Sequence, residues 1–258
     1  NPSYTENKSD KSTDDFNSLS NDYSTFNTNL SNKYTFLNPI QRGGLGYRYQ
    51  KDKLNFSFGA DAQQSLLQGA QQFPIAQKVN HSFNNILPNA MLNYKFTKAT
   101  NLRIYYRTST NLPSVSQLQS VVDISNPLQV KTGDQDLKQT FDNFLMCRIG
   151  GFNPMTSKNL MFFSSISTTS NYIANATYNL RNDTILQGTK IFKGSQLTKP
   201  VNLNGYYSLR SFFVLGFPIK VLKSNFNFNG GWSYSETPGI INSLKNISKS
   251  NSANGGIF

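Results

Sequence analysis

The chain has 258 residues, of which 37% are hydrophobic, 13% aromatic and 15% charged, and its formal net charge is +12. One cysteine and one histidine exclude an intrachain disulfide and a multi-ligand zinc site, and no apolar run is long enough for a membrane-spanning helix. Lys and Arg are scattered rather than clustered, so the positive charge does not indicate nucleic acid as a partner.

The first part of the chain, residues 1–37, is polar and rich in Asn, Ser and Thr. We expect a loop region of extracellular type there, with one helical turn near residues 14–19. An incomplete β-barrel over residues 38–258 forms the second predicted unit. The chain starts with neither Met nor a signal-peptide pattern, so either a signal peptide has been removed or the chain is an internal piece of a longer protein.

Alternation of apolar and polar residues then begins. In residues 43–50 and 54–63, Leu, Tyr, Phe and Ala occupy one parity and Gly, Asn, Ser and Arg the other. Residues 87–107 repeat the pattern in two runs around a short polar turn. A period of two predicts strands, and the short turns predict hairpins with one apolar and one polar face.

Further strands follow along the chain. The segments 203–215 and 222–234 alternate clearly, whereas 141–152 and 160–172 alternate poorly and their faces stay unassigned. Residues 250–258 predict the start of a last strand. Short turns are expected near 50–53, 97–100, 153–158 and 216–223, and long loops near 68–85, 108–139, 175–200 and 236–248. A helical turn is expected at residues 114–119 within the second of these loops.

Short turns at one rim and long loops at the other are typical of an outer-membrane barrel. The predicted fold class is therefore all-β: an antiparallel transmembrane β-barrel, partial with about nine strands, with short periplasmic turns and long extracellular loops. Lipid cannot satisfy backbone groups, so such a sheet must close, with its apolar face outward. A soluble β-sandwich that buries the apolar face, such as a glycan-binding module, is the alternative.

Residues 45–63, 87–141 and 238–251 resemble the barrel portion of outer-membrane proteins related to TonB-dependent receptors. Most specific are a pattern R-x-x-x-N-x-P-S-x-x-Q-L after the hairpin, then D-x-x-x-P-L and T-G-(D/N)-x-x-L-K. Candidate residues of this family-signature loop are Asn111, Pro113, Ser114, Gln117, Leu118, Asp123, Pro127, Gly133 and Asp134, and Arg107, Leu128, Thr132, Leu137 and Lys138 fit the same patterns.

The resemblance implies a large, even-stranded barrel in the cell outer membrane that takes up a bulky nutrient. It implies a plug domain elsewhere in the same chain, and outer-membrane lipid and lipopolysaccharide as surroundings. The plug and the energy-coupling motif do not occur in these residues, so the ligand stays open. The alternative function is a structural barrel subunit that acts with other envelope proteins and has no transport role.

Five cations are predicted to line the lumen, either as an electropositive path for an anionic ligand or as partners of plug carboxylates: Arg48, Lys95, Arg103, Arg107 and Arg210. Aromatic residues on the apolar side predict either an interfacial belt or ordinary packing. No catalytic, cofactor or metal residues are assigned, because His81 and Cys147 stand alone and Asp134 with Asp136 offers too few ligands for calcium. We therefore predict no enzyme and no cofactor.

Overall fold

The computed structural model of the chain describes residues 2–28, 31–73, 76–153, 155–219, 221 and 223–257. Its elements are β1 (Pro2–Lys11), β2 (Asp14–Asn17), β3 (Asp22–Phe26), β4 (Asn32–Lys51), β5 (Leu54–Phe73), β6 (Gln77–Lys95), β7 (Thr100–Asn111), α1 (Val115–Leu118), β8 (Gln129–Lys131), β9 (Thr140–Asn153), β10 (Lys158–Ser170), β11 (Tyr172–Asn179), β12 (Thr184–Leu186), β13 (Thr189–Ile191), β14 (Gln196–Leu203), β15 (Tyr206–Ile219), β16 (Ser224–Ile241) and β17 (Leu244–Ile257). No helix in this described part is long and apolar enough to cross a membrane.

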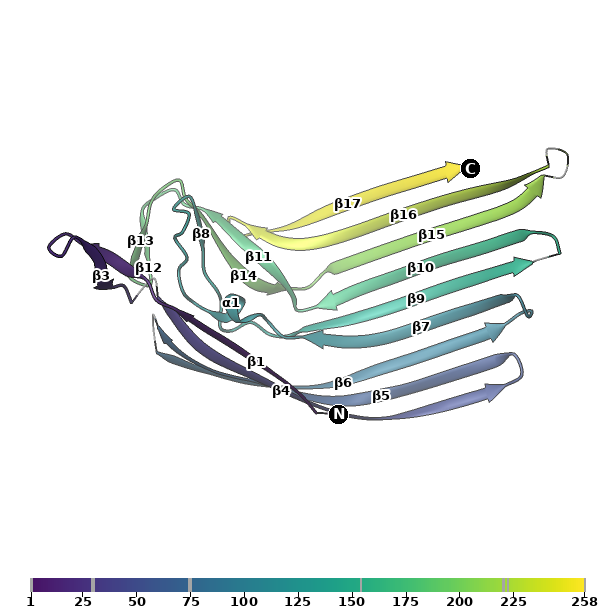
Figure 1. Cartoon of the computed structure of the whole chain (residues 1–258), viewed down its shortest axis with the longest axis horizontal. Coiled ribbons are helices and arrows are strands. Elements are labelled where there is room, and N and C mark those ends of the chain that lie inside the picture. The colour runs from purple at the N-terminus through teal and green to yellow at the C-terminus, as the bar shows by residue number, and fades with distance from the viewer. Residues whose placement is uncertain are drawn as a thin grey trace.

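Thirteen strands form one sheet, in the order β1-β4-β5-β6-β7-β9-β10-β15-β16-β11-β14-β8, with β17 also paired to β16. We call the nine long antiparallel strands the wall: β4, β5, β6, β7, β9, β10, β15, β16 and β17. Figure 1 shows the wall as a curved sheet with β17 at one edge. In the described residues β1 pairs only with β4 and β17 only with β16, so the sheet is open. The prediction of an all-β, mostly antiparallel sheet is confirmed.

Four short turns lie together at one rim, as predicted (Figure 1). They join β4 to β5, β6 to β7, β9 to β10 and β15 to β16. Residues with positive φ occur in three of them: Asp52 (47°), Ser157 (50°) and Lys223 (49°). A left-handed backbone at single turn positions lets each strand reverse direction within a few residues.

At the opposite rim, two of the four predicted long loops are wrong. The expected loop at 68–85 is almost entirely strand, because β5 continues to Phe73 and β6 begins at Gln77. The expected loop at 236–248 is a two-residue turn between β16 and β17, in which Asn242 (φ 48°) and Ser243 (φ 71°) are both left-handed. Polar residues on both faces of these extensions hid the strand period. The loops at 112–139 and 171–205 are long, but both contain regular structure.

The prediction for the N-terminal region is also wrong. Residues 2–11 form a strand paired along β4, and the expected helical turn at 14–19 is instead part of the β2–β3 hairpin. The predicted boundary at residue 37/38 falls inside β4, which begins at Asn32. β1 is largely polar and showed no strand period in the sequence, whereas the paired part of β4 contributes Phe36, only 2% exposed, to the core.

The strand register aligns the apolar residues into continuous rows across the wall. One row runs Tyr47, Phe58, Ala90, Tyr106, Leu145, Ile166, Leu209, Tyr234 and Asn251. The next row, nearer the short turns, runs Tyr49, Phe56, Leu92, Ile104, Cys147, Ser164, Ser211, Trp232 and Ala253. We call the side with these rows the apolar face. Five of the aromatic residues expected on this face (Tyr47, Tyr49, Tyr106, Trp232 and Tyr234) lie in these two rows, and their role as an interfacial belt stays a prediction.

The other side of the wall, the cationic face, is covered near the loop rim. Phe36, Leu67 and Val79 point to that face, and they pack with Leu118 and Leu137 in one buried cluster. Because Leu118 and Leu137 belong to the loop 112–139, this loop lies against the cationic face of β4, β5 and β6. A second cluster joins Val122 and Val130 of that loop with Ile191 of the next loop.

Candidate functional site

All five predicted lumen cations lie on the cationic face. Arg48 and Arg210 belong to one row, which runs through Ser57, Met91, Tyr105, Met146 and Ser165 between them. Arg103 and Arg107 follow on β7, and Lys95 is at the end of β6. The shared face is an observed property of the sheet, while its role as a lumen lining stays a prediction.

Two further arginines of this face, Arg42 and Arg148, were missed in the sequence. Arg148 lies directly opposite Arg103 in the β7–β9 pair, and both side chains are exposed. Like charges directly opposite one another destabilise a sheet. Among the described residues neither guanidinium has an ion pair, since the ion pairs there lie elsewhere: Lys8–Glu6, Lys33–Asp10, Lys190–Asp183 and Lys249–Glu236. Because residues 141–152 alternate poorly, the sequence does not indicate on which face of the sheet Arg148 lies.

That poor alternation has a physical cause on the cationic face. Phe163 lies beside Arg148 in its row, Phe212 follows on the next strand, and Phe144 lies opposite Arg107. The Arg107 guanidinium is 5.4 Å from the centroid of the Phe144 ring, which gives a cation–π contact. This part of the face, which the sequence left unassigned, therefore combines cations with large apolar side chains.

The first half of the family-signature loop folds around α1. The predicted helical turn is confirmed, and Ser114 caps it. The backbone N–H of Gln117 donates to the Ser114 hydroxyl, and the backbone N–H of Ser114 donates to the side-chain oxygen of Gln117 at 2.9 Å. This reciprocal pair is a capping box. Pro113 is buried, and Leu118 is only 1% exposed. Asn111 donates to the Asp142 carboxylate at 2.7 Å and so ties the loop to β9.

The second half of the signature closes the loop onto α1. The Gly133 N–H donates to the Gln119 carbonyl and the Asp134 N–H to the Gln117 carbonyl, both at 2.7 Å. A Cβ at position 133 would collide with these two carbonyl oxygens, so only glycine fits. Asp134 also accepts from the Asp136 N–H at 3.0 Å. The signature residues thus shape the loop, which sequence patterns alone did not indicate.

The two structured loops form one unit, which we call the loop body: residues 112–139 and 171–205. β8 pairs in parallel with β14, and the Thr132 N–H donates to the Thr198 carbonyl at 3.1 Å. The Ser195 hydroxyl donates to the carbonyl of the signature residue Pro127 at 2.7 Å. β11 in turn pairs with the end of β16, so the loop body is continuous with the wall.

Asp123, another signature residue, organises a turn in the loop body. It accepts from both the backbone N–H of Ser125 at 3.0 Å and the Ser125 hydroxyl at 2.5 Å. The hydroxyl contact, then the backbone contact, and more weakly the charges of Lys11 and Lys131 lower the pKa of Asp123. Asp123 is therefore a charged acceptor that fixes local backbone.

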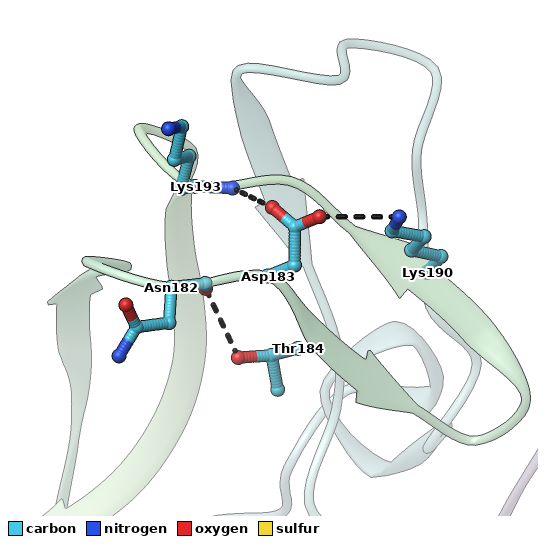
Figure 2. Close-up of polar contacts among 5 residues, drawn as sticks. All are labelled: Asn182, Asp183, Thr184, Lys190 and Lys193. Atoms are coloured by element: carbon cyan, nitrogen blue, oxygen red, sulfur yellow. Dashed lines mark hydrogen bonds and ion pairs between the residues drawn. The ribbon is translucent and has the colours of Figure 1, made fainter.

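The β12–β13 hairpin projects from the loop body, and a second aspartate holds its base (Figure 2). Asp183 accepts from the Lys193 backbone N–H at 3.0 Å and pairs with the Lys190 ammonium at 3.1 Å. These contacts, the backbone one first, lower the pKa of Asp183. Lys190 also lies 5.2 Å from the centroid of the Phe192 ring. The hairpin is thus held by polar contacts at the surface.

The residues set aside in the sequence do not assemble into a reactive site in the described part of the chain. No group of three or more His, Cys, Asp or Glu side chains gathers there in a metal-binding arrangement. Cys147 is half-buried on the apolar face, between Ile104 and Ser164. His81 lies on the cationic face of β6, stacked with Phe83 at 6.1 Å between ring centroids.

The two faces, the strand lengths and the rims define an outer-membrane type of sheet. Residues 3–256 match the outer membrane protein beta-barrel family, and the chain belongs to that family. It is a protein of the cell outer membrane, and the soluble β-sandwich alternative is therefore wrong. Barrels of this family are typically non-enzymatic, in agreement with the expectation from sequence.

Solved structures with a similar fold include siderophore receptors of Pseudomonas aeruginosa. A variant of the ferric enterobactin receptor PfeA in complex with enterobactin is 11% identical, with a TM-score of 0.45, over 92% of this chain and 43% of that chain. The siderophore receptor PirA is 11% identical, with a TM-score of 0.44, over 88% of this chain and 46% of that one. This chain spans less than half the length of either receptor. No curated protein matches the sequence.

Proposed function

We propose that the chain is part of an outer-membrane uptake barrel of the TonB-dependent receptor type, whose ligand passes along the cationic face. The observation that carries this proposal is the continuity of the apolar rows across the wall while the arginines of the wall all lie on the opposite face. Lipid and lipopolysaccharide surround the apolar face, and the cationic face lines the lumen. The loop body then lies at the extracellular entrance, on the lumen side.

The unpaired cations support a partner inside the barrel. Arg103 and Arg148 oppose each other without a carboxylate partner in the described residues, which is an unfavourable arrangement in isolation. We propose that a plug domain of the same chain supplies the carboxylates. The neighbouring Phe163 and Phe212 offer it apolar contact area, since interfaces are enriched in aromatic side chains and Arg.

Uptake by living cells tests the proposal. Cells with and without the full-length protein are given four radiolabelled probes: ferric citrate, cobalamin, maltohexaose and tetra-alanine. The proposal predicts that at least one probe accumulates only in cells with the protein, and that a protonophore abolishes the difference. Equal accumulation of all four probes in both strains, with the protein present in the outer membrane, would favour a structural envelope subunit instead.

A further inference from the structure

A cleft of about 530 Å³ lies on the cationic face, where the end of the family-signature loop meets β6. His81, Phe83 and Asn85 of β6 line one side, and the segment 136–139 lines the other. Phe141 and Asn171 complete it. Ligand clefts in proteins have volumes of roughly 300–1,000 Å³, so this cleft has the size of a small-molecule site.

Two amide side chains at this cleft have no hydrogen-bond partner. The Asn85 Nδ2 donor and the Gln139 Oε1 acceptor are both out of contact with solvent, and neither is satisfied by any group in the described part of the chain. Gln139 as a residue is only 8% exposed. Buried polar groups in native proteins are almost always paired, and an unpaired one needs an explanation. The terminal torsion of an amide is soft, so each side chain can present either its oxygen or its nitrogen to a ligand.

The charges of the lining are balanced. Asp136 carries a negative charge and Lys138 a positive one, and they form no ion pair with each other or with another described residue. A cleft with one charge of each sign gives no preference for an anion, unlike the Arg-rich part of the face near the short turns. A neutral ligand with many hydrogen-bonding groups fits this lining better.

Aromatic side chains supply the remaining contacts. Phe83 and Phe141 line the cleft, and His81 stacks on Phe83. Aromatic rings pack against the C–H faces of a sugar, while amides and carboxylates bind its hydroxyl groups, each of which both donates and accepts. A hydroxylated ring therefore fits all three features of this cleft: its unpaired amides, its balanced charges and its aromatic side chains.

We propose that this cleft is a binding site for a neutral saccharide, with Asn85 and Gln139 as its hydrogen-bonding residues. The inference names the ligand class of the proposed uptake function and rests on that function for its role. Binding itself is independent of transport. The site also gives Lys138, at the end of the family signature, a place beside the ligand.

Calorimetry on the full-length protein tests the proposal. The protein is kept in a dimethylamine-oxide detergent, because detergents with sugar headgroups would compete for the cleft. The probes are three neutral trisaccharides (maltotriose, cellotriose and triacetylchitotriose), trigalacturonate as an anionic saccharide and triserine as a peptide. We expect at least one neutral trisaccharide to bind, and both Asn85→Leu and Gln139→Leu to weaken that binding at least about tenfold.

Asn93→Leu is the matched control. Asn93 is on the same strand and face as Asn85, its Oδ1 is also buried without a partner, and it lies about 27 Å along β6 from Asn85. We expect this variant to bind like the parent protein. Thermal unfolding of the Gln139→Leu variant adds a second readout: removal of an unpaired buried amide leaves the melting temperature unchanged or raises it, although binding is lost.

Several results would overturn the saccharide site: no neutral trisaccharide binds the parent protein, only triserine or trigalacturonate binds, or the control weakens binding as much as Asn85→Leu does. An ordered water that satisfies both amides, with no saccharide bound, would overturn it as well. These results leave the uptake proposal standing if probe accumulation still depends on the protein. Conversely, intact saccharide binding without any accumulation rejects uptake and keeps the site.

Discussion

The wall and the loop body are stabilised in different ways. The buried hydrophobic residues in the described part of the chain belong to the loop body or to β4, β5 and β6, where all but Leu87 lie in the half of the strand nearest to the loop body. The strands β9, β10, β15, β16 and β17 contribute none. Instead they expose large apolar side chains, such as Leu145, Phe162 and Trp232. Most of the wall therefore depends on its surroundings for burial, while the loop body shares one core with β4, β5 and β6 and makes a second core of its own.

This difference separates the roles of the two regions. An apolar face that no protein covers is stable in lipid, where backbone pairing supplies the structure and lipid covers the side chains. A loop in water must bury its own apolar groups, and the family signature does so through Leu118 and Leu137. A prefolded loop body pays less ordering entropy when a ligand binds than a mobile loop does.

The largest loss of stability is expected from a substitution on the apolar face of β10. Ile166 is on the apolar face, and its neighbour Ser167 is on the cationic face. Ile166→Arg is expected to lower the free energy of unfolding in lipid bilayers by about 2–4 kcal/mol, because a cation then faces hydrocarbon. Ser167→Arg is the control and should change it by much less. Denaturant titration of the full-length protein measures both, and equal losses would contradict the assignment of faces.

Truncation of Leu118 should open the loop body and spare the wall. Leu118→Ala removes a side chain that is 1% exposed and is expected to cost about 2–5 kcal/mol of local stability. Limited proteolysis should then cleave within residues 112–139 faster, with the wall still resistant. Leu128, 68% exposed in the same loop, gives the control Leu128→Ala, which should be cleaved like the parent. Simultaneous loss of wall and loops would show that the two regions are one cooperative unit.

A methyl group at Gly133 should disturb the loop closure. Gly133→Ala is expected to destabilise the loop body by about 1–3 kcal/mol, because the added carbon meets the carbonyl oxygens of Gln117 and Gln119. Gly43→Ala on β4 meets nothing within 4 Å and should be nearly neutral. Hydrogen exchange of the loop amides measures the difference. If the loop amides are equally protected from exchange in both variants, the contacts of Gly133 with Gln117 and Gln119 do not restrict the residue at this position.

The smallest expected effect concerns Asp123. Its pKa in the folded chain lies below the ordinary value of 3.8, so its stabilising contribution is present above about pH 4 and is lost as the pH falls through the lowered pKa. Asp123→Asn should therefore cost less than about 1 kcal/mol at neutral pH, and the difference should shrink as the pH falls below the ordinary pKa of 3.8. Proteolysis of the loop body with an acid-active protease and a neutral one compares the two conditions. A difference that persists at low pH would contradict the role of the charge.

The sequence predicts the wall well where each face has one chemistry. Residues 45–63, 87–107 and 203–234 alternate cleanly, and each contains the expected hairpin, although β15 begins at Tyr206 and continues to Ile219, inside the predicted turn 216–223. The faces of β9 and β10 were not predictable, because Phe144 and Phe163 place aromatic rings on the cationic face. The extensions beyond the apolar rows were missed for a related reason: strands in water are polar on both sides, so no period is visible.

The candidate sites were predicted less completely. The five cations share one face because alternation is strictly local, but the pairing of Arg103 with Arg148 depends on the register between β7 and β9. The signature was noticed as a pattern, whereas its capping box and glycine contact emerge only from the folded loop. The cleft joins Asn85 with Gln139, which are far apart in the chain, and amides are too common in this sequence to be singled out.

The central claim, that the two faces of the wall meet lipid and lumen, can be tested on four serines. Ser164 and Ser211 are paired on the apolar face with their hydroxyls 3.0 Å apart, and Ser167 and Ser208 are paired on the cationic face. Cys147→Ser removes the single cysteine of this chain, so each serine can be replaced by a spin-labelled cysteine in its turn.

Electron paramagnetic resonance of the full-length protein in lipid vesicles then measures how often each spin label collides with oxygen, which dissolves in lipid, and with a nickel chelate, which stays in water. We expect labels at 164 and 211 to collide mainly with oxygen, and labels at 167 and 208 not to do so. Similar oxygen and nickel accessibility at all four positions, or the reverse assignment, would contradict it.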